Sequence, residues 1–137
     1  MFTRERPVRF EDIDAAQIVF FPRVIVYCHE TLELFLNQLE GGHSGLIMKR
    51  RIGLPAVHLD MEFKKPLRYG DSVNIQLEVT KIGTSSVGLR YTVLRVGDGA
   101  LIAVINHVCV LSAIDELRSV PIPADVRALL EQHLVPA

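Results

Sequence analysis

The sequence predicts an α+β protein in which one long helix packs against a five-stranded antiparallel sheet. From Arg23 to Glu40, apolar side chains recur at spacings of three and four residues, which places them on one face of a helix. Later segments joined by hairpin-length turns alternate apolar and polar residues, as strands do. One helix set apart from a run of strands is typical of the α+β class.

The predicted helix has well-marked ends and one apolar face. Pro22 suits its first turn, where a missing N–H has no cost, and Gly41-Gly42 suits its end, where a positive φ is often needed. The residues expected to face the core are Ile25, Cys28, Leu32, Phe35, Leu36 and Leu39.

The strands follow from period-two alternation. Three segments alternate clearly, and Gly97-Asp98-Gly99 turns into a fourth, Ala100–Leu111, whose apolar run predicts a central strand covered on both faces. A first strand is expected at Arg6–Phe10 and a short amphipathic helix at Val126–Leu134. The three alternating segments are Val57–Phe63, Val73–Val79 and Val87–Val93.

Length and composition indicate an ordinary globular protein. The 137 residues suit one domain, expected to span 1–137, with 49% hydrophobic and 23% charged side chains. A net charge of −1 without a basic tract argues against nucleic acid as a partner. Because we find no signal peptide and no membrane-spanning run, we expect a cytoplasmic protein that does not bind a membrane. Cys28 and Cys109 are expected to be buried free thiols.

Carboxylates precede the long helix, directly before an apolar run. Asp14, on spacing alone, resembles a helix cap together with Gln17, but a carboxylate beside apolar walls also acts as nucleophile or general base. The helix start offers free N–H groups that can hold a substrate carbonyl and stabilise an oxyanion formed from it. Asp12 is either a second active-site acid or an exposed or loop-bracing carboxylate.

The run from Asp12 to Pro22 resembles the signature of the 4-hydroxybenzoyl-CoA thioesterase family. Phe63-x-x-Pro66-Leu67-x-x-Gly70-Asp71-x-Val73, the Gly97-Asp98-Gly99 turn and Ile122-Pro123 match it as well. The resemblance covers almost the whole chain. It implies the hot-dog fold, in which the sheet wraps around the long helix and active sites form between subunits, and therefore a homodimer or homotetramer.

The resemblance also implies an activity, hydrolysis of an acyl-CoA thioester, aryl or of short to medium chain. Asp14 would be the catalytic nucleophile or general base, and N–H groups near Phe21 would polarise the carbonyl, with no metal or cofactor. The chain departs from the family in three places. Gln17 stands where many members have glycine, Phe20-Phe21 where others have Tyr-His, and the neutral loop Gly83-Thr84-Ser85 where some carry arginines.

Other polar and aromatic residues are candidates for contacts with the substrate. Gln17, Phe20 and His58 are candidates for the acyl group, although capping, core packing and structural hydrogen bonding explain them as well. Two basic clusters are candidates for the CoA phosphates, against the alternative that they simply face solvent. They are Lys49-Arg50-Arg51 and Lys64-Lys65.

Two alternatives to the hydrolase remain open from the sequence. One is a non-catalytic protein that binds acyl thioesters or serves as an assembly subunit, with Asp14 acting only as a cap. The other is a hot-dog dehydratase or hydratase, although no histidine paired with an acid stands at the helix. His29, His43 and His133 lie in no pattern that resembles a metal site.

Overall fold

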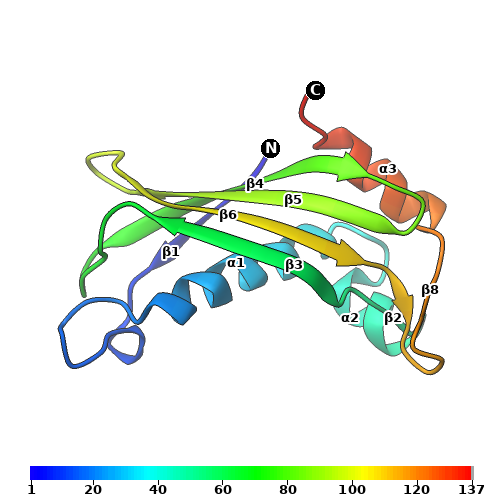
Figure 1. The fold of residues 1–137 in the computed structure, drawn as a ribbon, viewed down its shortest axis with the longest axis horizontal. Coiled ribbons are helices and arrows are strands. Elements are labelled where there is room, and N and C mark those ends of the chain that lie inside the picture. Colours follow the sequence, from blue (N-terminus) through cyan, green and yellow to red (C-terminus); the bar gives the residue numbers. More distant parts are fainter. Residues whose placement is uncertain (137) are drawn as a thin grey trace.

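A computed structural model describes residues 1–136 and contains a five-stranded antiparallel sheet (Figure 1). The order across this sheet is β1-β4-β5-β6-β3, so β1 and β3 form its two edges. The strands are β1 (Phe2–Pro7), β3 (Ala56–Phe63), β4 (Ser72–Ile82), β5 (Ser86–Arg95) and β6 (Leu101–Val110). The predicted α+β hot-dog architecture is confirmed.

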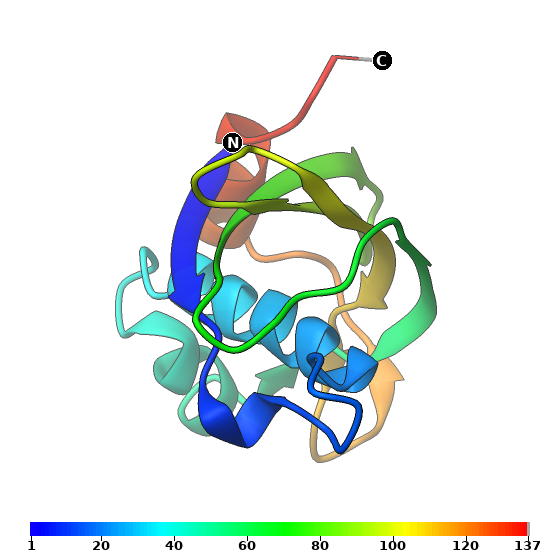
Figure 2. The same ribbon diagram turned by 90° about the vertical axis from the view of Figure 1, so that its left-hand side faces the viewer.

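The long helix α1 (Phe21–Leu36) lies against one face of the sheet, which curls around it (Figure 2). Alternate side chains of β4 and β5 point at the helix and are buried, as Val73, Ile75 and Leu77 show. On α1 the same core takes Val24, Cys28 and Phe35, each with at most 2% of its surface exposed. The 3.6-residue and two-residue periods of the sequence therefore meet in one apolar interface.

Smaller elements close the ends of this arrangement. The 3-10 turn η1 (Phe10–Asp12) precedes the loop before α1, and α2 (Gly42–Met48) follows α1. A second sheet has the order β2-β7-β8, formed by β2 (Ile52–Gly53), β7 (Ser112–Ala113) and β8 (Arg118–Ser119). The terminal helix α3 (Ala124–Gln132) buries Val126, Leu129 and Leu130, whereas Leu134, expected in it, lies beyond its end.

The predicted first strand, Arg6–Phe10, is misplaced along the chain, although Val8 faces the core as expected. The strand is Phe2–Pro7, Phe10 lies in η1, and 73% of the Phe10 side chain is exposed. Arg6, on the same face as Val8, is also buried, with 1% exposed. An inward arginine is tolerated here because the carboxylates of Asp12 and Glu30 neutralise it.

The long helix also ends earlier than expected. Pro22 lies in its first turn as predicted, but the helix stops at Leu36 and not near Glu40. Gly41 and Gly42 have φ of 82° and 67° and turn the chain into α2, which the sequence did not predict. Leu39 is nevertheless buried, because the turn after α1 holds it against the core.

Strand β6 lies inside the sheet, but one of its faces is less covered than expected. Ile105 and Cys109 on the inner face are fully buried, whereas Asn106 on the outer face is exposed and Val104 and Val108 are half-buried. Cys28 and Cys109 are free and buried, as predicted. In residues 1–136 no helix combines the length and the apolar character needed to cross a membrane.

Candidate functional site

Asp14 lies in the loop between η1 and α1 and does not cap the helix. The residue that caps α1 is Phe20, six positions further on, and its side chain makes no capping hydrogen bond. The carboxylate of Asp14 accepts a hydrogen bond from the Ala16 N–H at 2.8 Å, and its backbone exchanges bonds with Ile18 and Gln17. The capping role that spacing suggested for Asp14 and Gln17 is therefore wrong, because this turn is complete before the helix begins.

The start of α1 offers one backbone donor next to this loop. Pro22 has no N–H, the Arg23 N–H donates to the Phe20 carbonyl at 2.8 Å, and the Phe20 N–H donates to the Asp12 carbonyl at 2.9 Å. Among residues 1–136, the Phe21 N–H has no acceptor, as expected for the first residue of a helix. It lies at the positive end of the helix dipole.

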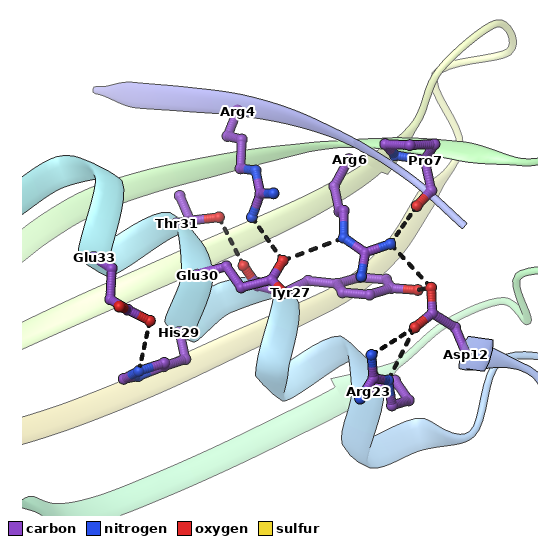
Figure 3. Close-up of polar contacts among 10 residues, drawn as sticks. All are labelled: Arg4, Arg6, Pro7, Asp12, Arg23, Tyr27, His29, Glu30, Thr31 and Glu33. Carbon is purple, nitrogen blue, oxygen red and sulfur yellow. Dashed lines mark hydrogen bonds and ion pairs between the residues drawn. The ribbon is translucent and has the colours of Figure 1, made fainter. Parts of the chain in front are cut away.

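Asp12 anchors the loop and is entirely buried (Figure 3). One carboxylate oxygen accepts bonds from Tyr27 Oη at 2.7 Å, Arg6 Nη1 at 2.9 Å and the Arg9 N–H at 2.8 Å. The other oxygen accepts bonds from Arg23 Nε at 2.9 Å and Nη2 at 2.8 Å. Asp12 thus braces the loop, which is one of the two roles that the sequence predicted for it. Both of its carboxylate oxygens are occupied by these bonds, so neither is available to a substrate.

The electrostatics of Asp12 agree with a permanently ionised carboxylate. Burial opposes its ionisation, but the hydrogen bonds from Tyr27, the Arg9 N–H, Arg23 and Arg6 outweigh burial and lower its pKa to about 2. The Arg6 guanidinium also lies 4.3 Å from the centre of the Tyr27 ring. Sequence reasoning missed Arg6, Arg23 and Tyr27, because their contact with Asp12 is set by the packing of β1 and η1 on α1.

An apolar cavity of about 290 Å³ opens beside the start of α1. Phe21 of α1 and Phe63 of β3 line it together with Ile18, Pro66 and Leu67, and the Val19 N–H donates to the Leu67 carbonyl at 2.8 Å. Asp14 lies four residues before Ile18 and is not itself one of the lining residues. The family-like motifs at 12–22 and 63–73, distant in sequence, therefore meet at one place.

The two basic clusters lie in different parts of the molecule. Lys64 and Lys65 line the cavity at the start of α1; Lys64 Nζ lies 3.0 Å from Glu62, and Lys65 is exposed. Lys49-Arg50-Arg51 follows α2, which lies at the opposite end of α1 from the loop between η1 and α1 (Figure 1). Arg50 pairs with Asp125 and Arg51 with Asp115. Lys49, Arg50 and Arg51 therefore lie away from the start of α1 of their own chain, and two of them already pair with carboxylates. They are not part of the CoA site proposed below for the same chain.

The three residues predicted to contact the acyl group are all exposed. Gln17 is in the left-handed region, with φ of 68°, and the Phe20 ring contacts the Phe21 ring at a tilt of 56°, with ring centres 5.7 Å apart. His58 lies on the outer face of β3, where its Nε2 is 2.9 Å from Asp60 Oδ2. Within one chain, Gln17 and Phe20 lie near the site and His58 does not.

The fold is that of a hot-dog protein, and a partly exposed carboxylate, Asp14, precedes its central helix. The sequence model of the thioesterase-like superfamily matches residues 8–130, so the chain belongs to this superfamily.

Relatives within the superfamily agree with this class. A 1,4-dihydroxy-2-naphthoyl-CoA hydrolase from Thermosynechococcus vestitus is 31% identical over 93% of this chain and 86% of its own length. The counterpart from Nostoc punctiforme is 33% identical over 80% of this chain and 74% of its own. These relatives confirm the expected enzyme class, acyl-CoA thioesterase.

Solved structures give the same result. A gentisyl-coenzyme A thioesterase superposes with a TM-score of 0.82 at 32% identity, covering 91% of this chain and 98% of that one. A 1,4-dihydroxy-2-naphthoyl-CoA thioesterase from Synechocystis reaches 0.87 at 26% identity, covering 98% of both chains. The resemblance to 4-hydroxybenzoyl-CoA thioesterases is therefore correct at the level of the superfamily. These relatives are named for other acyl groups, 1,4-dihydroxy-2-naphthoyl and gentisyl.

Proposed function

We propose that the protein hydrolyses an acyl-CoA thioester, with Asp14 as the residue that attacks the carbonyl or activates the attacking water. The observation that carries this proposal is the state of the Asp14 carboxylate. It is partly exposed, and its described contact is the Ala16 N–H, so most of its lone pairs are free. Its neighbour Asp12, by contrast, is buried and fully paired.

The start of α1 supplies the second half of the chemistry. In the proposed reaction, the thioester carbonyl accepts a hydrogen bond from the Phe21 N–H, and the helix dipole stabilises the negative charge that develops on that oxygen. Oxygen from water ends in the free acid, the carbon–sulfur bond breaks, and the CoA thiolate takes up a proton. Asp14 as nucleophile or as general base satisfies this balance equally.

We propose an aromatic acyl group as the preferred substrate. The cavity beside α1 is lined mainly by apolar side chains, among them Phe21 and Phe63. An aromatic acyl group packs well against such aromatic side chains. Relatives named for 1,4-dihydroxy-2-naphthoyl-CoA and gentisyl-CoA support the same choice. Lys64 and Lys65 at the cavity are the proposed contacts for the CoA phosphates.

The test replaces Asp14 and assays a panel of acyl-CoAs that varies chain length and aromaticity. Asp14→Asn keeps the shape of the side chain but removes the base and nucleophile, so we expect kcat/KM to fall by about 10²-fold to 10⁴-fold. Glu11→Gln is the matched control, since Glu11 is an exposed carboxylate in the same segment, and it should hydrolyse the panel like the parent. Undiminished turnover by Asp14→Asn would exclude the proposed role.

A further inference from the structure

A second apolar cavity, of about 170 Å³, lies further along α1, between the helix and the β3–β6 pair. Ile25 on α1, Leu59 on β3 and Ile105 on β6 supply apolar walls. A neighbouring cavity of about 450 Å³ shares His29 and His107 with it. Two imidazoles therefore face a space that is otherwise mostly apolar, an arrangement that core packing alone does not require.

His107 presents one ring nitrogen to this space. Tyr91 Oη lies 3.3 Å from His107 Nδ1, and the two rings stack with centres 6.1 Å apart. Among residues 1–136, His107 Nε2 has no hydrogen-bond partner. This nitrogen is not fully enclosed by protein atoms, so a bound molecule can reach it. Because His107 lines both cavities, Nε2 is the ring nitrogen available to a molecule bound there.

The partner of Nδ1 determines which nitrogen of His107 carries the proton. Burial, with smaller contributions from Cys28 and Cys109, raises the pKa of Tyr91 above its usual range, so its hydroxyl stays protonated and donates to Nδ1. Burial and the nearby His29 lower the pKa of His107, which keeps the imidazole neutral. A neutral ring that accepts at Nδ1 carries its hydrogen on Nε2. The cavity therefore contains an uncharged hydrogen-bond donor.

His29 differs from His107 because its Nε2 already pairs with the carboxylate of Glu33. His29 Nε2 lies 3.0 Å from Glu33 Oε2, and His43 Nδ1 lies 3.6 Å from the other oxygen of Glu33. The side chain of His29 is also 61% exposed, and Figure 3 shows its ring paired with Glu33. His107 is the donor directed at the interior.

The second cavity follows the first along the same side of α1. Phe21 and Phe63 line the cavity at the helix start, and Ile25 and Leu59 line the next one. His107 is paired with Leu59 across β3 and β6. The eight residues from Phe21 to His29 correspond to about 12 Å along the helix. An extended acyl group of that length, with its carbonyl at the Phe21 N–H, spans the stretch of α1 between the residues that line the two cavities.

We propose that this cavity binds the distal part of the acyl group and that His107 Nε2–H donates a hydrogen bond to an oxygen substituent there, a hydroxyl or a carbonyl. This inference rests on the proposed function for the position of the thioester, and it narrows the substrate to acyl groups that carry an oxygen remote from the thioester. A neutral donor in an apolar cavity favours such a group, because an acyl group without the oxygen leaves the donor unpaired.

The experiment measures binding, so that it does not depend on hydrolysis. Non-hydrolysable thioether analogues of 4-phenylbenzoyl-CoA and 4-(4-hydroxyphenyl)benzoyl-CoA, which place a ring beside the thioester and differ only in a remote hydroxyl, are titrated into the full chain by calorimetry. We expect the hydroxylated analogue to bind about threefold to tenfold more tightly than the plain one, the effect of one neutral hydrogen bond. In His107→Phe, which keeps the ring stacked on Tyr91, this ratio falls to about one while the affinity for the plain analogue is retained.

Two further variants make the result specific. Tyr91→Phe keeps the cavity walls but removes the donor to Nδ1; the ratio falls, and the ¹⁵N shifts of His107 show loss of the single Nε2–H form. Asn106→Leu changes the preceding residue, exposed on the outer face of β6, and keeps the parent ratio. Equal affinities in the parent protein, or an unchanged ratio in His107→Phe, overturn the inference. Failure of the Asp14 test removes the proposed catalysis but leaves this binding ratio as it is.

Discussion

Two carboxylates two residues apart, Asp12 and Asp14, have opposite environments. Asp12 is buried, ionised and fully hydrogen-bonded, whereas Asp14 is partly exposed with a single described contact to its carboxylate. The first holds η1, β1 and α1 together, which fixes the loop that carries the second. A buried charge kept in this way is costly to remove, since its partner Arg6 then lacks part of its compensation.

We therefore expect Asp12→Asn to lower the free energy of unfolding by about 3 kcal/mol. Because the pKa of Asp12 is lowered to about 2, its stabilisation, about 2 kcal/mol, is complete above the unfolded pKa near 4 and is lost as the pH falls towards 2. Urea unfolding between pH 2 and 7 measures both effects, and the pH dependence of the variant should be shallower below pH 5. A variant with the parent's acid profile would contradict this assignment.

At the scale of elements, the sequence predicted the long helix and the five strands well and their ends less well. Hydrophobic periodicity identified β4 and β5 because each has one face on the core. It also identified β3, although only Met61 of that strand is partly buried in the single chain. It misplaced β1, since the inward residue there is Arg6, whose burial depends on Asp12 and Glu30 from other elements. The Asp12–Asp14 segment was found through family resemblance, but no spacing rule revealed that Asp12 is an anchor.

The short β7–β8 connection contains a strained residue that the sequence pattern does not reveal. Leu117 has φ of 53°, a region that favours glycine, and 89% of its side chain is exposed. We expect Leu117→Gly to stabilise the protein by about 0.5–1 kcal/mol, because relief of strain exceeds the entropy that glycine adds to the unfolded chain. Thermal unfolding should show a midpoint higher by about 1 to 3 °C, with activity unchanged. A lower midpoint would mean that the Leu117 side chain makes stabilising contacts.

For the whole molecule, the open edge at β3 is the feature that a single chain does not explain. β3 is an eight-residue edge strand with Val57 62% exposed and Leu59 43% exposed. On the adjacent outer face of β6, Val104 and Val108 are half-buried. Long edge strands with exposed apolar side chains are surfaces on which further chains pair. We propose that a second copy packs against β3, in agreement with the homodimer or homotetramer expected from family resemblance.

This proposal predicts the mass of the protein in solution. Light scattering after gel filtration should give two or four times the 15.3 kDa of one chain. Val57→Lys places a charge on the edge and should shift the mass towards one chain, because an unpaired ammonium is costly to bury. Val96→Lys is the control; Val96 is 45% exposed just after β5, away from the β3 edge, and its substitution should leave the mass unchanged. A parent protein of single-chain mass would show that β3 stays open, and it would leave each Asp14 with only the groups of its own chain.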